Sequence, residues 1–363
     1  MLDFTLDQEQ DMLERTIRRF AEERMRKVFR DAEEDGALPR QVVQAGWEIG
    51  LLPTGLPEAY GGFGEYSAVT NVIGVEALAW GDLALTLAIL APNLVAIPLM
   101  VAGTPEQQAE YLPQFAGEEP PAVTAALVEP RLRWNPRKLE TTAVAGDGGY
   151  VLNGVKRLVP LADSAELFLI YAAEEGRVQA FLVPAGTEGL TVGEREMVMG
   201  IHALPLFQLS LDNVRVPAEN RLGGEAGIDF GLLLNHSRLA LGAAAVGVAR
   251  AGYEYAREYA KQRVQFGEPI AHRQSIAFML ADMAIDVESA RLLVWEAAWK
   301  LDQGQDITRE ATVMKQFVDR VVLDTADRAV QILGGYGYIR EYPVELWLRN
   351  ARGFAHFDGI AMI

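Results

Sequence analysis

The sequence predicts an α+β protein with an N-terminal all-α domain, a middle antiparallel β domain and a C-terminal antiparallel four-helix bundle. Three observations support this order. Apolar residues recur at helical spacing in the first third, form short alternating runs between turns in the middle, and return to helical spacing up to Arg352. Half of the 363 residues are apolar, enough to bury several packed subdomains. We expect the domains to span 1–120, 121–222 and 223–363.

The N-terminal part is expected to be helical. Thr5 and Gln8 have the spacing of a capping box, and Leu13, Ile17 and Phe20 then fall on one helical face. These features predict that the chain enters its first helix within the first ten residues or so.

Three further signals organise the rest of this part. A turn-rich loop at 53–64 precedes a second apolar helical run from Val72. The stretch 83–104 carries no charge and is long enough to tempt a membrane-spanning assignment, but its prolines predict buried helices broken at those positions. Another helix is expected to begin at Thr104, where threonine can cap and the following proline suits the first turn.

The middle part shows strand signals. Asn153-Gly154 separates two apolar runs and predicts a β-hairpin turn, since such turns need positive φ. Phe207, Leu209 and Leu211 alternate with polar residues, as in a half-buried strand. Further runs at 167–171 and 179–183 are expected to complete the antiparallel domain, which ends near Gly223.

The last part reads as long helices with short connections, which predicts an antiparallel bundle. Similar helical segments surround 242–252 and 313–333. One apolar face keeps helical spacing for roughly five turns and consists of Ile276, Met279, Leu280, Met283, Val287, Ala290 and Val294.

Charge and composition exclude several classes of partner and site. The formal net charge of −17 disfavours nucleic acid and anionic membranes, so an anionic ligand needs local cations. The chain has no cysteine, and its four histidines show no ligand spacing, so we expect no metal. The first 15 residues carry charge throughout and lack an apolar signal region, so we expect a cytoplasmic location.

Short motifs follow one another along nearly the whole chain. They are PEAYGG at 57–62, GTPEQQAEYLPQFAGEE at 103–119, VEP at 128–130, RVQFG at 263–267, AFMLADM at 277–283 and QILGGYGYIREYPVE at 331–345. In order and spacing they resemble the flavin-dependent acyl-CoA dehydrogenase family. The resemblance implies the acyl-CoA dehydrogenase fold, FAD as cofactor, an acyl-CoA substrate, an electron-transfer flavoprotein as acceptor, and a homotetramer or heterotetramer built as a dimer of dimers.

The implied reaction is α,β-dehydrogenation, in which a carboxylate removes the α-proton and flavin N5 accepts a hydride. The Tyr342-Pro343 motif places Asp358-Gly359 on the family's Glu-Gly pair, which makes Asp358 the candidate base. Aspartate is one methylene shorter than glutamate, a displacement of about 1.5 Å. The alternative is a solvent-facing aspartate without a catalytic role.

Two other groups of residues match family binding positions. Asn235, Arg238 and Gly359 correspond to substrate-binding positions, and Arg238 can hold the CoA end. A second group matches the contacts to the ADP half of FAD, many of which reach a neighbouring subunit's flavin in the family. Guanidinium groups can bind pyrophosphate and glycines allow close approach. This second group consists of Arg263, Phe266, Arg273, Gln274, Gln331, Gly334 and Gly335.

The middle domain departs from the family pattern at the isoalloxazine side. Where the family has T-E-P-G-A-G-S-D, residues 128–135 read VEPRLRWN, and where it has W-I-T or W-I-S, residues 158–160 read LVP. Ile360 replaces a threonine that contacts the flavin. The first change creates a cationic cluster that either offsets CoA phosphates or, as we favour, plugs the vacated pocket. The cluster consists of Arg131, Arg133, Arg137 and Lys138.

Three functions fit these observations. The leading one is an acyl-CoA dehydrogenase with Asp358 as base. The second is a non-catalytic subunit that completes the FAD site of a different, active chain, because the ADP-side positions survive while the isoalloxazine-side positions do not. The third, an oxidase of the nitroalkane type, rests on the aspartate alone, since nitroalkane oxidases use an aspartate at this position.

Overall fold

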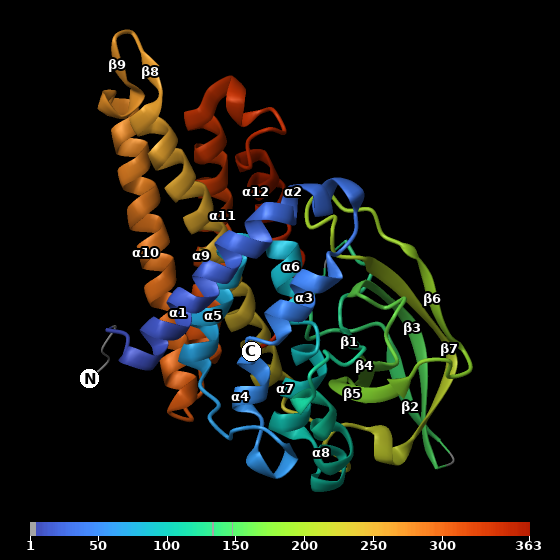
Figure 1. The fold of residues 1–363 in the computed structure, drawn as a ribbon. Coiled ribbons are helices and arrows are strands. Elements are labelled where there is room, and N and C mark those ends of the chain that lie inside the picture. The colour runs from blue at the N-terminus through green and yellow to red at the C-terminus, as the bar shows by residue number, and fades with distance from the viewer. Residues whose placement is uncertain (1–4, 133, 147) are drawn as a thin grey trace.

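The computed structural model describes residues 5–132, 134–146 and 148–363. Figure 1 shows a helical layer and a β layer side by side, with the N-terminal helices lying across the bundle and against the sheet. The predicted order of a helical part, a β part and a second helical part is confirmed. The N-terminal helices are α1 (Gln8–Phe20), α2 (Arg26–Asp35), α3 (Arg40–Trp47), α4 (Leu51–Gly55), α5 (Ala68–Gly81), α6 (Leu83–Ile89), α7 (Asn93–Ala102) and α8 (Pro105–Tyr111).

The capping box of α1 lies two residues later than predicted. Asp7, not Thr5, is the N-cap: its Oδ1 accepts from the backbone N–H of Gln10 at 2.8 Å, and the Gln10 side chain accepts from the Asp7 N–H at 3.3 Å. Asp7 and Gln10 have the same spacing as the predicted pair, and a carboxylate also suits the positive end of a helix. The predicted cap of α8 at Thr104 is confirmed, with Gln107 as its reciprocal partner.

The uncharged stretch 83–104 forms buried helices, as predicted. The chain breaks between α6 and α7 around Pro92, whereas Pro98 lies inside α7, so the second predicted break is wrong. Nearly all residues of both helices are buried within the fold. The helix α9 (Phe230–Gln262) is also long and apolar enough to span a membrane, but 89% of its most apolar stretch is buried inside the protein.

The middle domain is a seven-stranded sheet in the order β1-β4-β2-β3-β7-β6, with β5 paired to β4. Most pairs are antiparallel, but β1 and β2 both run parallel to β4, which the sequence analysis did not predict. The strands are β1 (Val123–Ala126), β2 (Thr142–Gly146), β3 (Gly149–Pro160), β4 (Leu167–Glu174), β5 (Arg177–Pro184), β6 (Leu190–Arg195) and β7 (Leu206–Pro217).

The hairpin predicted at Asn153-Gly154 is wrong. Both residues lie inside the continuous strand β3, which begins at Gly149, three residues after β2 ends at Gly146. At this point the register against β7 shifts, and Asn213 on β7 takes a φ of 54°. Its backbone N–H donates to Asn153 Oδ1 at 2.8 Å. The Asn-Gly pair therefore lies opposite a β-bulge on β7, where Asp212 and Asn213 face the single residue Asn153 and Asn213 adopts the left-handed conformation.

The two faces of the sheet pack against different partners. Leu169 and Tyr171 on β4 join a core that includes residues of α7 and α9, while Phe168 and Ile170 point into the core of the β domain itself. This alternation follows from the two-residue period of a strand. The ends of β1 and β3 thereby lie next to the helices that carry the candidate site: β1 contacts α7, and Leu158 of β3 packs in one core with Ile360 and Ala361.

The C-terminal helices form a bundle of long, consecutively antiparallel members. The helix α9 ends in a two-stranded hairpin, β8 (Val264–Gln265) and β9 (Glu268–Pro269), which projects from the end of the bundle away from the sheet (Figure 1). The remaining helices are α10 (Gln274–Asp302), α11 (Thr308–Leu333) and the eight-residue α12 (Val344–Ala351). The apolar face predicted for α10 is confirmed, since Met283, Val287, Ala290 and Val294 are buried.

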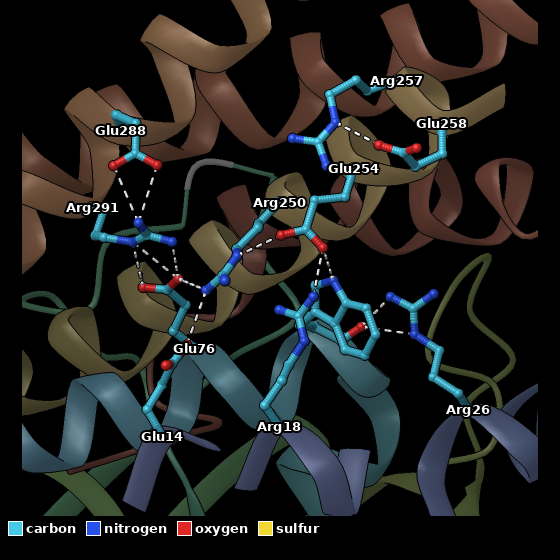
Figure 2. A network of polar contacts seen from close by, with 11 residues as sticks. Glu14, Arg18, Arg26, Glu76, Arg250, Glu254, Arg257, Glu258, Glu288 and Arg291 are labelled. Carbon is cyan, nitrogen blue, oxygen red and sulfur yellow. Dashed lines mark hydrogen bonds and ion pairs between the residues drawn. The ribbon is translucent and has the colours of Figure 1, made fainter. Parts of the chain in front are cut away.

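A polar network fastens α1 and α5 to the bundle (Figure 2). Glu76, buried on α5, accepts hydrogen bonds from Arg291 Nη2 at 2.6 Å and from Arg250 Nη1 at 3.0 Å. Glu254 on α9 accepts from Arg18 of α1 at 2.5 Å. Buried carboxylates are tolerated only when paired in this way.

Trp80, at the end of α5, lies between two guanidinium groups. The guanidinium carbons of Arg18 and Arg26 lie 3.3 and 3.8 Å from its ring centroid. Arg26 Nη2 also donates to the Trp80 carbonyl at 2.6 Å. Burial lowers the pKa of Arg26 to about 10. The cation–π contacts thus hold α1 and α2 against α5, and Glu254 of α9, which accepts from Arg18 and from Trp80 Nε1, ties this group to the bundle.

Candidate active site

Asp358 lies on a tight turn that follows α12 and a short 3₁₀ segment (Phe354–His356). Its side chain is half-buried, and its Oδ1 is buried without a hydrogen-bond partner. The next residue, Gly359, has a φ of 84°, and a Cβ at this position would lie 2.5 Å from a methyl group of Leu127. Its N–H donates to Ser237 Oγ at 2.9 Å. The turn therefore needs glycine and is tied to α9.

The residues after this turn run into the interior. Ile360, Ala361, Met362 and Ile363 are all buried. The Asn93 side-chain amide on α7 donates to the Met362 carbonyl at 3.1 Å. The segment around Asp358 is consequently held from both sides, by α9 and by α7.

The two predicted substrate-binding residues on α9 both face α11. Asn235 Nδ2 donates to Thr308 Oγ1 at 3.2 Å, and Arg238 Nη1 donates to Thr312 Oγ1 at 3.0 Å. Asn235 Oδ1 and Arg238 Nε are buried without partners. The structure therefore gathers Asp358, Gly359 and these two residues around one stretch of α9, with polar atoms left free for a further contact.

Two residues that no sequence motif marks, Lys315 and Asp319, complete this region. Lys315 Nζ, buried on α11, donates to Asp319 Oδ2 at 2.6 Å and to the Phe354 carbonyl at 2.9 Å. Burial raises the pKa of Asp319, and the nearby Asp358 raises it further, whereas Lys315 and Arg238 act in the opposite direction. The four-residue spacing of Lys315 and Asp319 on one helical face was the available sequence signal.

A cleft of about 430 Å³ separates the β domain from α12. Phe357, the residue before Asp358, lines it, while Asp358 itself does not. Three nitrogen donors of cleft-lining residues are buried without partners: Trp134 Nε1, Arg157 Nε and Arg349 Nη2. Apolar side chains and four arginines (Arg131, Arg157, Arg349 and Arg352) line the cleft. Arg131, Arg157 and Arg349 pair with glutamates, so the cleft offers N–H donors to an acceptor-rich ligand with a flat apolar part more than it offers net positive charge.

The altered motifs of the middle domain border this cleft. Glu129 is engaged within the protein, since it accepts from Lys156 Nζ at 2.8 Å and from the N–H groups of Glu140 and Thr141 at 2.7 and 2.9 Å. The Leu158 N–H donates to Glu196 at 2.8 Å. These groups are therefore not free to bind a ligand, and the remaining donors of the cleft are mainly arginine side chains.

The cationic cluster does not plug the cleft, contrary to the interpretation that the sequence favoured. Of its described members only Arg131 lines the cleft, where it pairs with Glu140 at 2.9 Å. Arg137 lies instead near Gly231 at the start of α9. Arg133 lies outside the described residues. Backbone turns on either side of Asn135 point the Arg131 and Arg137 side chains in different directions. Their closeness in the sequence does not show these directions.

The predicted ADP-binding residues lie at the other end of the bundle, around the β8–β9 hairpin (Figure 1). A hollow of about 410 Å³ is lined by Arg263, Gly334, Gly335 and Tyr336 among others. The Arg263 guanidinium carbon lies 5.1 Å from the Tyr336 ring centroid. Gly334 has φ 58° and ψ −129°, a conformation that belongs to glycine, and no atom lies within 4 Å of a Cβ built on either glycine.

The remaining members of this group are less enclosed. Arg273 pairs with Glu268 at 3.0 Å across the hairpin. Phe266 is 95% exposed, and Gln274 and Gln331 are exposed as well. The structure thus places the predicted site residues in two groups, one around Asp358 and one around the hairpin, and it does not bring the two groups together within the chain.

Comparison with known proteins decides the family. Models of the acyl-CoA dehydrogenase N-terminal, middle and C-terminal domains match residues 7–119, 124–214 and 231–362. The chain belongs to the acyl-CoA dehydrogenase family. An acyl-CoA dehydrogenase of Bacillus subtilis is 35% identical over 360 residues, which cover 97% of this chain and 94% of the relative. A caffeyl-CoA reductase–Etf complex subunit of Acetobacterium woodii is 34% identical, covering 97% and 95%.

The fold agrees with solved members of the family. The structure of butyryl-CoA dehydrogenase from Megasphaera elsdenii superposes with a TM-score of 0.90 at 32% identity and covers 99% of this chain and 96% of that one. The chain is accordingly an acyl-CoA dehydrogenase-like flavoprotein, an oxidoreductase that acts on CH–CH groups, and FAD is its cofactor. The unpartnered donors of the cleft and the glycine-lined hollow fit the acceptor-rich ring and the phosphates of FAD.

Proposed function

We propose that this chain dehydrogenates an acyl-CoA thioester and that Asp358 is the base that takes the α-proton. The observation that carries this proposal is the unpartnered, buried Oδ1 of Asp358 on a turn fixed by Ser237 and Gly359. A base for a weakly acidic C–H proton needs a free lone pair in a dry, rigid setting. The turn supplies these features, and Phe357 connects it to the cleft.

The other predicted residues take binding roles in this proposal. Bound FAD supplies a hydride acceptor for the β-carbon. The arginines of the cleft hold acceptor groups of the cofactor in place of the family's hydroxyl and backbone donors. Arg238 and Asn235 hold the CoA end of the substrate, and their unpartnered atoms support that role. The hairpin group, from Arg263 to Gly335, holds the ADP half of a flavin across a subunit interface.

The electron acceptor in this proposal is an electron-transfer flavoprotein. The similarity to a subunit of an Etf complex supports this acceptor. We also propose that the chain works as a homotetramer or heterotetramer, because the hairpin group can contact a flavin only if another subunit holds that flavin beside it. The cytoplasm is the proposed compartment.

The visible spectrum of the purified protein tests the proposal. The expected result is a yellow protein whose flavin absorbance falls when an acyl-CoA of suitable length is added without oxygen. Asp358→Asn, which keeps the shape of the side chain but removes the base, is expected to retain the flavin and to lose the bleaching. Bleaching at the wild-type rate in this variant would refute the role of Asp358. Peroxide release on addition of a nitroalkane would point to an oxidase instead.

A second candidate function is a non-catalytic subunit that completes a partner's FAD site. It is favoured by the placement of the ADP-side residues around a projecting, exposed hairpin at the end of the bundle away from the sheet (Figure 1). Co-expression with a related dehydrogenase separates the two candidates. If the chain alone binds one flavin per chain and is reduced by acyl-CoA, the partner-subunit function is excluded. If flavin and activity need both chains, and Asp358→Asn changes neither, that function is supported.

A further inference from the structure

Asp358 lies within a tight turn that begins at Phe357. The Ile360 N–H donates to the Phe357 carbonyl at 3.0 Å and closes the turn. Gly359 follows Asp358 with a φ of 84°, as the third residue of a type II turn does. The direction of the Asp358 side chain therefore depends on how firmly the two ends of this turn, Phe357 and Ile360, are held.

The Phe357 ring packs directly on Gly353. A Cβ built on Gly353 would lie 1.9 Å from Phe357 Cζ, 2.4 Å from Cε2 and 2.7 Å from Cε1, so no other residue fits here while the ring keeps its place. Gly353 itself has φ −77° and ψ −26°, a helical conformation that ordinary residues adopt freely. Glycine is therefore required at this position for the space that the ring occupies and not for the backbone.

The other contacts of the ring leave it one direction in which to move. Phe354 packs edge-to-face against it, with ring centroids 5.8 Å apart and an interplanar angle of 61°. Both phenylalanines belong to one buried core, which also contains Ile360. Phe357 lines the cleft next to the β domain together with Gly353. Because the interior is closely packed, a side chain added at Gly353 pushes the ring toward the cleft.

We propose that Phe357, packed on Gly353, is a positioning residue for Asp358, because its ring fixes the first residue of the turn and with it the direction of the carboxylate. The inference rests on the proposed function, since it concerns the candidate base of that reaction. Ser237 holds the same turn at Gly359. A base must lie within hydrogen-bond reach of the proton that it removes, so a turn held at both places keeps the carboxylate in range.

A double-variant cycle tests the contact between Gly353 and Phe357. Gly353→Ala suits the helical backbone but adds the colliding Cβ, so flavin reduction at saturating acyl-CoA is expected to slow on the order of 100-fold. Phe357→Leu lacks the ring atoms that collide, so adding Gly353→Ala to it is expected to cause little further slowing. Equal slowing in both backgrounds, or none in either, would overturn the proposal. Gly252→Ala on α9, where a Cβ would lie 3.6 Å from the Ala329 Cβ, is the matched control and should leave the rate unchanged.

Crystal structures of the variants give a second readout that needs no activity. In Gly353→Ala the Phe357 ring is expected to turn toward the cleft and the Asp358 carboxyl to be displaced by about 1 Å, the misplacement on which the expected slowing is based. An Asp358 carboxyl at its wild-type position in Gly353→Ala would overturn the proposal. If butyryl-CoA, octanoyl-CoA and palmitoyl-CoA all fail to bleach the flavin of the wild type, the proposed function is refuted, while the position of the carboxyl still decides whether Phe357 directs Asp358.

Discussion

Ser237 on α9 accepts a hydrogen bond from the N–H of Gly359, and this single contact ties the turn that carries Asp358 to the longest helix of the bundle. The two residues are 122 positions apart in the chain. Both are buried, so the contact has no water to replace it. The position of the candidate base therefore depends on the packing of α9.

Ser237→Ala should separate this anchoring from the fold as a whole. The variant leaves the buried Gly359 N–H unpaired, so we expect a loss of about 1–3 kcal/mol in the free energy of unfolding. A displacement of about 1 Å of Asp358 should also lower the rate of flavin reduction on the order of 100-fold. Denaturant unfolding and anaerobic stopped-flow absorbance measure the two effects. Ser164→Ala, at an exposed serine of the β domain, is the control and should change neither.

Glu76→Gln tests the network in Figure 2. Glu76 is the shared acceptor of Arg250 and Arg291, and its loss leaves two partly buried guanidinium groups without it. We expect a destabilisation of about 3–5 kcal/mol. Glu288→Gln removes a 62% exposed partner of the same Arg291 and should cost about 1 kcal/mol or less. Equal losses in the two variants, measured by denaturant unfolding, would contradict a special role for the buried carboxylate.

Asp82 gives a pH dependence with a definite sign. It is buried and caps α6 through the Leu85 N–H at 2.9 Å, and burial raises its pKa to about 6. An unfolded aspartate titrates near about 3.9. Above about pH 6 the buried carboxylate is charged and lowers the free energy of unfolding by its full amount. This destabilisation disappears between about pH 6 and 4, as the carboxyl of the folded protein takes up its proton.

Asp82→Asn keeps a good cap without the charge, so it should be more stable than the wild type at pH 8 by up to about 3 kcal/mol, and the advantage should vanish near pH 4. Urea unfolding at several pH values measures this difference. Asp229→Asn, at the exposed cap of α9, is the matched control and should show little pH-dependent change. A constant difference for Asp82→Asn across this range would show that burial does not govern its titration.

Local patterns predicted the elements better than their connections. The buried face of α10, which contains Met283 and Val287, could be predicted because apolar residues recur every three to four positions on the buried face of a helix. Asn153-Gly154 misled, because the pair lies in a strand opposite a bulge on β7, and only the pairing with Asn213, 60 residues away, reveals this.

The candidate site shows the same limit. Asp358 could be named by its place in a family motif. Ser237, Lys315 and Asp319 carry no motif, because their role comes from the packing of α9 and α11 against the Asp358 turn. The direction of the Arg137 side chain likewise depends on turns that a run of charges does not specify. Resemblance thus located the candidate base, whereas its supporting contacts required the tertiary structure.

The hairpin group yields the last prediction, which concerns FAD. Arg263 stacks near Tyr336 beside Gly334 and Gly335, in a hollow open to another molecule. If this hollow holds the ADP half of a flavin, Arg263→Ala removes a charge-assisted bond to phosphate worth about 1.5–3 kcal/mol. FAD should then bind about 10- to 100-fold more weakly. Titration of the flavin-free protein with FAD, followed by fluorescence, measures this change.

Arg257→Ala is the control for this change, because Arg257 lies on the same helix and pairs with Glu258 at the surface. It should leave FAD affinity unchanged. The result also bears on subunit arrangement: mixing Arg263→Ala chains with Asp358→Asn chains should restore one intact flavin site with a working base only if the hollow of one subunit serves the Asp358 of another. If Arg263→Ala and the wild type bind FAD with equal affinity, the hollow does not bind FAD, and the cleft alone holds the cofactor.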